Sequence, residues 1–129
     1  MGQHLLHDFD PGVVFDLEPV DAVTVTALMD SVTDIFMPDQ GPARRWPVWA
    51  GPQRPAATME GGMAPDALLA EHGFSVLVTV SKDGSRHQLL FDAGTSPDGV
   101  VANMDRLELD PAAIEAIICS HGHFDHTTG

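Results

Sequence analysis

The segment from Phe74 to Phe91 constrains the fold most strongly, because its pattern is that of a β-hairpin. Phe74 to Val80 is rich in β-branched residues, and His87 to Phe91 forms a second apolar run. Lys82-Asp83-Gly84-Ser85 between them has the chemistry of a turn. A chain that contains such a hairpin must pack it against further elements, since an isolated hairpin is marginally stable.

Further elements are indicated on both sides of the hairpin. Val23, Val25 and Ala27 alternate with threonines, which predicts a half-buried strand. Residues 65–72 favour a short helix, and Ser96-Pro97-Asp98 has the pattern of a helix start. The buried face of that second helix would be Val100, Val101, Met104 and Leu107. A helical turn from Asp110 and an apolar strand at 117–119 follow, so strands and helices alternate and predict an α/β (α+β) layered fold.

The length of 129 residues fits one domain or part of one. Residues 1–20 show no period and are interpreted as an irregular arm, which leaves 21–129 as the folded part. Residues 38–66 hold six of the ten prolines and four of the twelve glycines, which predicts a long loop. Loops of this length are often functional or disordered, so a lid over a site and a loose insertion both stay open.

The chain has 19 acidic and 6 basic residues and a formal charge of −13. Nucleic acids and anionic membrane surfaces are therefore disfavoured as partners, and a small-molecule substrate is expected. No apolar run approaches the roughly 18 residues of a membrane span, and the first residues lack a signal peptide. With a single cysteine, Cys119, the sequence favours the cytoplasm and leaves the oligomeric state open.

The chemistry of the chain is concentrated in His121-Gly122-His123-Phe124-Asp125-His126, which follows the apolar strand at 117–119. Imidazole nitrogen and carboxylate oxygen are ligands that suit zinc. Residues two apart in an extended segment point the same way, so His121 and His123 can bind one ion. If a helix begins at Asp125, then Asp125 and His126 can face a second ion, and Gly122 would permit close backbone approach.

This motif, together with Leu89-Leu90-Phe91-Asp92-Ala93-Gly94 at the preceding strand end, resembles the metallo-β-lactamase superfamily. The resemblance covers roughly residues 21–129. Ala70-Glu71-His72-Gly73-Phe74-Ser75 is similar to the branch that contains the dihydropterin-ribofuranosylaminobenzene phosphate synthase. The superfamily fold is an αββα sandwich of two similar halves, and the chain would supply the N-terminal half. Thr128 stands where the family often has glycine.

The resemblance implies that His121 and His123 bind a first zinc ion and that Asp125 and His126 bind a second. Asp125 is thereby also the candidate catalytic residue. Asp92 would orient the ligands through hydrogen bonds without binding the metal, and His72 could line the pocket. The family supplies a further His, a bridging Asp and a last His from later in the chain, so these ligands are expected beyond residue 129.

The resemblance implies a hydrolase that uses a metal-activated water on an ester or phosphate-type metabolite, with a pterin-related substrate if the branch holds. Zinc is the expected metal, in two ions, with iron or manganese as alternatives. The alternative enzyme is an iron oxidoreductase of the same fold, such as a persulfide dioxygenase. The alternative of another kind is a truncated fragment that keeps the metal-binding segment without turnover.

Overall fold

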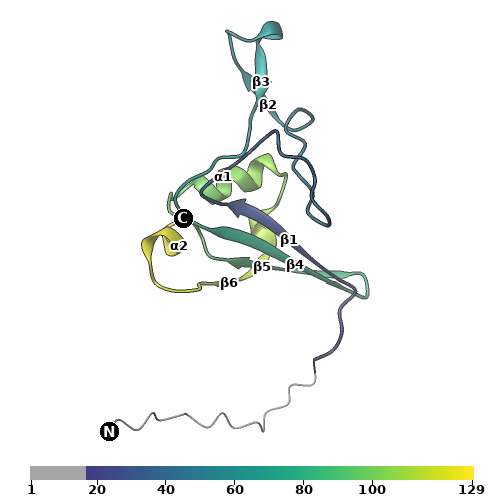
Figure 1. Cartoon of the computed structure of the whole chain (residues 1–129). Coiled ribbons are helices and arrows are strands. Elements are labelled where there is room, and N and C mark those ends of the chain that lie inside the picture. Colours follow the sequence, from purple (N-terminus) through teal and green to yellow (C-terminus); the bar gives the residue numbers. More distant parts are fainter. Residues whose placement is uncertain (1–16) are drawn as a thin grey trace, which may run out of the picture.

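A four-stranded sheet forms the centre of the computed structural model, which describes residues 17–129 (Figure 1). The strand order is β1-β4-β5-β6, with β1 (Ala22–Met29), β4 (Ser75–Lys82), β5 (Ser85–Phe91) and β6 (Ile114–Ile118). β4 is antiparallel to β1 and β5, whereas β6 is parallel to β5. The fold is therefore mixed α/β, and most of the arm expected at residues 1–20 lies outside the described residues.

The connection from β5 to β6 contains α1 (Gly99–Arg106) and the single turn η2 (Pro111–Ala113). Parallel neighbours require such a crossover, because their ends lie at opposite edges of the sheet. Val100 and Met104, one helical turn apart, face the sheet and pack on Leu28, Leu77 and Leu90. Val101 was expected on the same helix face, but it is 53% exposed, because it follows Val100 directly and points sideways.

The hairpin predicted from the sequence is confirmed as β4 and β5. Asp83 and Gly84 connect the two strands with φ values of 50° and 80°. Positive φ at both residues is what the favoured two-residue hairpin turn requires, and Asp-Gly is a preferred pair for it. The turn sets the register in which Val78 pairs with Leu89, so the apolar side chains of both strands fall on common faces.

The sheet face opposite α1 is apolar and open among the described residues. The register places Val25, Val78 and Leu89 side by side on that face. Val23 and Val25 are 56% and 61% exposed there, and Ile118 at the other edge is 45% exposed. A sheet with a helix on one face and bare valines on the other is what one half of a layered sandwich presents.

The segment between β1 and β4 differs from two expectations. Residues 65–72 form no helix. The side chain of Asn103 accepts a hydrogen bond from Leu69 N at 2.8 Å and donates one to Leu69 O at 2.9 Å, so these backbone groups are not available for helical hydrogen bonds. Within 38–66 the chain forms a small hairpin, which projects beyond the sheet in Figure 1. It consists of β2 (Gln53–Pro55), η1 (Glu60–Gly62) and β3 (Met63–Pro65).

Over residues 17–129 the structure contains no helix that is long and apolar enough to cross a membrane.

Candidate metal centre

The candidate ligands lie where β5 and β6 end at the same edge of the sheet. Phe91 pairs with Ile118, so the residues that follow the two strands, Asp92 and Cys119-Ser120, run side by side. The chain then passes through His121–His123 and turns into α2 (Phe124–Thr127). The parallel pairing of β5 and β6 is what brings Asp92 to a motif about 30 residues later in the sequence.

Asp92 is the buried anchor of this region, with 1% of its surface exposed. Its carboxylate accepts hydrogen bonds from Ser120 N at 2.7 Å and from Ser120 Oγ at 2.8 Å, and it lies 2.7 Å from His126 Nδ1. Burial by itself would raise the pKa of this carboxyl, but the hydrogen bonds from Ser120 and His126 outweigh burial and lower its pKa. Asp92 is therefore ionised, and the ring N–H of His126 donates to it.

Asp92 also has a backbone φ of 57°, in the left-handed region. Asp tolerates this conformation better than most residues, yet it still costs free energy at a buried position. The conformation turns the chain sharply after β5 and keeps the carboxylate directed at Ser120 and His126. A strained backbone held in place by several hydrogen bonds is common at functional sites.

His121 and His123 form a close pair of imidazoles. His121 Nε2 lies 3.0 Å from His123 Nδ1, and the ring centroids are 4.5 Å apart. Two nitrogens that bind one tetrahedral zinc ion at about 2.1 Å are separated by about 3.4 Å. The observed separation is close to that value, so a small opening of the pair would admit an ion.

Asp125 and His126 lie in α2 beside this pair. The His126 ring centroid is 4.3 Å from that of His121, and His126 Nε2 is 3.6 Å from Asp125 Oδ2. Because Nδ1 of His126 is directed at Asp92, Nε2 is the nitrogen left to bind a metal ion. The structure thus brings all four motif residues together, and it places Asp92 directly behind one of them.

Among residues 17–129, no group of three or more His, Cys, Asp or Glu side chains is arranged to hold a metal ion. The imidazoles of His121 and His123 are hydrogen-bonded to each other, and His126 is paired with Asp125, so the four side chains do not point at a common centre. Three imidazoles and a carboxylate nevertheless form a donor set that zinc prefers. The residues fit the metal in type and in pairwise distance, and they cover only part of a coordination shell.

His72 approaches the cluster from the segment before β4. Its Nε2 lies 3.5 Å from Asp125 Oδ2, and its side chain is 81% exposed. His72 therefore borders the candidate ligands while facing outward, which is where a side chain that contacts a substrate would lie. Among residues 17–129, nothing lies within 4 Å of a Cβ added at Gly122, so the backbone of the motif is open on that side.

Two residues of the site escaped prediction from the sequence. Ser120, which directly precedes the motif, donates both its N–H and its hydroxyl to Asp92, and its Oγ lies 2.9 Å from His121 Nδ1. Glu71 was noted only as part of a resemblance, but its carboxylate accepts from Thr95 N and Ser96 N at 2.8 and 3.0 Å. The partners of both are far away in sequence, so only the fold reveals them.

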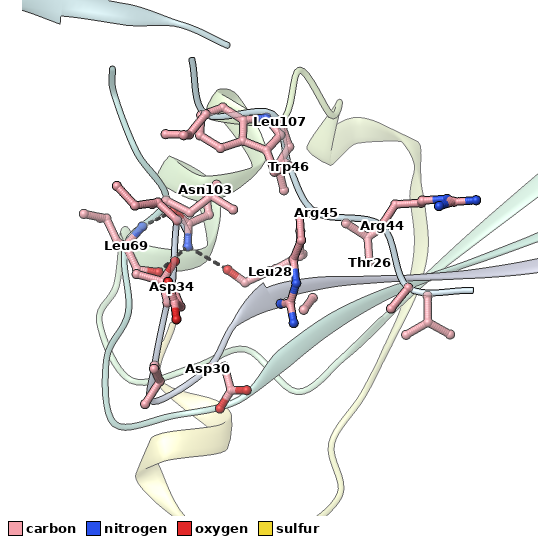
Figure 2. Close-up of a pocket in the computed structure, with 18 of the residues that line it drawn as sticks. Thr26, Leu28, Asp30, Asp34, Arg44, Arg45, Trp46, Leu69, Asn103 and Leu107 are labelled. Carbon is pink, nitrogen blue, oxygen red and sulfur yellow. Dashed lines mark hydrogen bonds between the residues drawn. The ribbon is translucent and has the colours of Figure 1, made fainter. Parts of the chain in front are cut away.

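A cavity of about 570 Å³ lies elsewhere, between β1, α1 and the segment that follows β1. Figure 2 shows Leu28, Asn103 and Trp46 around it, with Arg45 reaching in from one side. Residues 42–46 and Val48 of the long loop line this cavity, and none of residues 121–126 does. The part of the loop that was a candidate lid therefore borders a different space from the histidine cluster.

Residues 69–129 match the family model of the metallo-beta-lactamase superfamily. Over 60 residues the chain is 42% identical to 7,8-dihydropterin-6-methyl-4-(beta-D-ribofuranosyl)-aminobenzene-5'-phosphate synthase of Methanocaldococcus jannaschii. That alignment covers 46% of this chain and 20% of the synthase.

An uncharacterised protein of the same organism is 37% identical over 62 residues, which are 48% of this chain and 22% of that protein. The chain thus spans about a fifth of the length of the curated relatives it matches. Both the family match and the similarity to these relatives are confined to about half of the chain.

Proposed function

Because residues 69–129 belong to the metallo-beta-lactamase superfamily, we propose that the cluster after β6 is part of a dinuclear zinc centre. His121 and His123 would hold one ion, and Asp125 and His126 the other. The protein that contains this chain would be a metal-dependent hydrolase of a small metabolite. The observation that carries the proposal is the 2.7 Å contact between Asp92 and His126 Nδ1, which leaves Nε2 of His126 available on the side of Asp125.

The chain's own residues contribute orientation and charge to this chemistry. Asp92 fixes the ring of His126, and Ser120 fixes Asp92 and lies beside His121, so two ligands share one support. Asp125 Oδ2 lies between the imidazoles of His72 and His126, at 3.5 and 3.6 Å. A carboxylate in that position can bind a metal ion or hold a proton next to the reacting group. Zinc, when bound, would act as a Lewis acid and lower the pKa of water to about 7.

The substrate class we propose is a small phosphate or ester compound. One relative is named as the synthase of a pterin-containing phosphate, and the family match over residues 69–129 includes Glu71 and His72. His72 is exposed beside Asp125, so it is the residue of this chain that we assign to substrate contact. The formal charge of −13 argues against a nucleic-acid substrate.

The test is metal analysis combined with hydrolysis assays on the protein that contains this chain. Metal content by mass spectrometry should show zinc, and p-nitrophenyl phosphate or p-nitrophenyl acetate should be hydrolysed. Replacing Asp125 with Ala should abolish turnover and lower the zinc content. If the protein carries one iron ion and hydrolyses neither compound, the iron-dependent oxidoreductase would replace the hydrolase.

A further inference from the structure

Three stretches of backbone that are distant in sequence meet next to the candidate metal centre. They are residues 71–74 before β4, residues 92–96 after β5, and residues 125–128 around α2. Phe74 N donates to Asp125 O at 3.3 Å, and Gly94 N donates to Phe74 O at 3.0 Å. Ala93 N donates to His126 O at 2.8 Å, so the backbones of both α2 ligands are tied into this junction.

The carboxylate of Glu71 joins two of these stretches without involving the candidate ligands. Its Oε1 accepts from Thr95 N at 2.8 Å and from Ser96 N at 3.0 Å, and its Oε2 accepts from Ser96 Oγ. A second connection between the same two stretches comes from Thr95, whose hydroxyl donates a hydrogen bond to His72 O. The carboxylate therefore holds the loop after β5 against the segment that carries His72.

The packing around Glu71 leaves little room for any other arrangement. An added Cβ at Gly94 would lie 2.8 Å from Glu71 Oε1, and one at Gly99 would lie 3.1 Å from Oε2. An added Cβ at Gly73 would lie 2.8 Å from Thr95 Oγ1 and 2.9 Å from Asp125 O. Glycine at these three positions allows the stretches to approach closely enough for the hydrogen bonds to form.

We propose that Glu71 is a positioning residue of the metal centre: through Thr95 and Ser96 it fixes the junction that holds the backbone of Asp125 and His126. This inference rests on the proposed metal centre. The Glu71 carboxylate forms no hydrogen bond or ion pair with any of the four candidate ligands; its partners in residues 17–129 are Thr95 and Ser96. We expect Glu71 to affect metal binding indirectly, because it fixes the position of the loop 92–96, which also contains Asp92.

The experiment compares Co²⁺ titrations of the 129-residue chain with those of three variants, followed by visible absorption. Glu71→Ala removes the acceptor, Glu71→Gln keeps one oxygen acceptor, and Glu60→Ala removes the same charge from the exposed turn η1. Loss of a residue that orients metal ligands without binding the ion commonly weakens metal binding about 10–100-fold. We expect a decrease in that range for Glu71→Ala. Glu71→Gln should recover most of the affinity, and Glu60→Ala should match the original chain.

A second readout does not depend on the metal. Amide chemical shifts of residues 121–128 should change in Glu71→Gln and remain unchanged in Glu60→Ala, since only the first alters the junction. If Glu71→Ala does not fold, Ser96→Ala takes its place, because it removes the hydroxyl donor and keeps the carboxylate. Ser96→Ala should then shift the same amides and weaken Co²⁺ binding by a smaller factor.

The titrations distinguish a wrong metal centre from a wrong role for Glu71. If the original chain and His123→Ala give the same Co²⁺ titration, the metal centre itself is wrong. If His123→Ala loses binding while folded Glu71→Ala, or Ser96→Ala in its place, keeps the original affinity, spectrum and amide shifts, only the role of Glu71 is overturned. A lower melting temperature of Glu71→Ala with unchanged Co²⁺ affinity would also overturn it, because the carboxylate would then serve stability alone.

Discussion

The carboxylate of Asp92 lies 2.7 Å from Nδ1 of His126, although the two residues are 34 positions apart in the sequence. The parallel pairing of β5 with β6 creates this contact, because it brings the ends of both strands to one edge of the sheet. The contact sets the tautomer of His126 and directs Nε2 toward Asp125. Asp92, which the family resemblance indicated, therefore orients the ring of a candidate ligand in the structure.

Asp92→Asn should weaken zinc binding about 10–100-fold, because the amide keeps one oxygen acceptor for Ser120 and His126 but loses the negative charge. Zinc affinity by competition with a chromophoric chelator measures the effect. Asp98→Asn is the control, since Asp98 is exposed and its side chain makes no capping hydrogen bond at α1. Equal affinities of the two variants would refute a supporting role for Asp92.

Gly94→Ala should destabilise the chain more than Gly84→Ala. Both glycines have positive φ, 73° and 80°, so each substitution carries the left-handed strain of roughly 1–2 kcal/mol. Only at Gly94 would the new Cβ also meet an oxygen of Glu71 at 2.8 Å, whereas Gly84 has open space. Urea unfolding at neutral pH checks the order, and equal losses would show that the junction can relax around the extra methyl group.

The stability of the chain should depend on Glu71 in a pH-dependent way. Burial raises the pKa of Glu71, but hydrogen bonds from Ser96 and Thr95 outweigh burial and lower it below the ordinary value of 4.5. A lowered folded-state pKa means that the stabilisation is complete well above pH 4.5 and is lost as the pH falls through the folded pKa.

Glu71→Gln should therefore be less stable than the original chain at pH 7, and the gap should narrow as the pH drops below 4.5. Denaturant unfolding of both proteins from pH 7 to pH 3 measures this gap. A difference that stays constant over the whole range would show that ionisation of Glu71 is not coupled to folding.

The open sheet face should make the 129-residue chain associate. Val23 and Val25 are 56% and 61% exposed, and Ile118 adds to the same apolar surface. Val25→Thr, which keeps a β-branched side chain, should lower the association measured by sedimentation velocity. Val32→Thr is the matched control, because Val32 is 75% exposed and lies in the loop outside the sheet. A monomeric original chain with a sharp cooperative melt would contradict this expectation.

The sequence predicted the elements that depend on local patterns. The structure confirms a strand at β1, the Asp-Gly turn between β4 and β5 and a strand before His121, all of which are encoded by neighbouring residues. The last strand spans Ile114–Ile118 and not 117–119, and the valines of β1 are exposed. The expectation of a helix at residues 65–72 is wrong, because hydrogen bonds between the backbone of Leu69 and the side chain of Asn103, more than 30 positions away, override the good helix formers there.

In the candidate metal centre, too, local sequence pattern predicted some features and distant contacts determine the others. The spacing in 121–126 identified the cluster, because all four side chains lie in one short segment. The hydrogen bonds of Ser120 and Glu71 could not be predicted from local pattern, since their partners are set by strand pairing and by the approach of three glycines. Sequence periodicity identifies candidate ligands more readily than it identifies the residues that hold them.

Equilibrium dialysis of the 129-residue chain against zinc shows whether residues 121–126 bind a metal ion. We expect weak zinc binding, because the four motif residues supply three or fewer ligands to each ion. His123→Ala should remove that binding, since it breaks the imidazole pair whose nitrogens lie 3.0 Å apart. His87→Ala should leave it intact, because His87 is paired with Glu115 in the sheet. If His123→Ala binds zinc as the original chain does, the motif is not the metal centre.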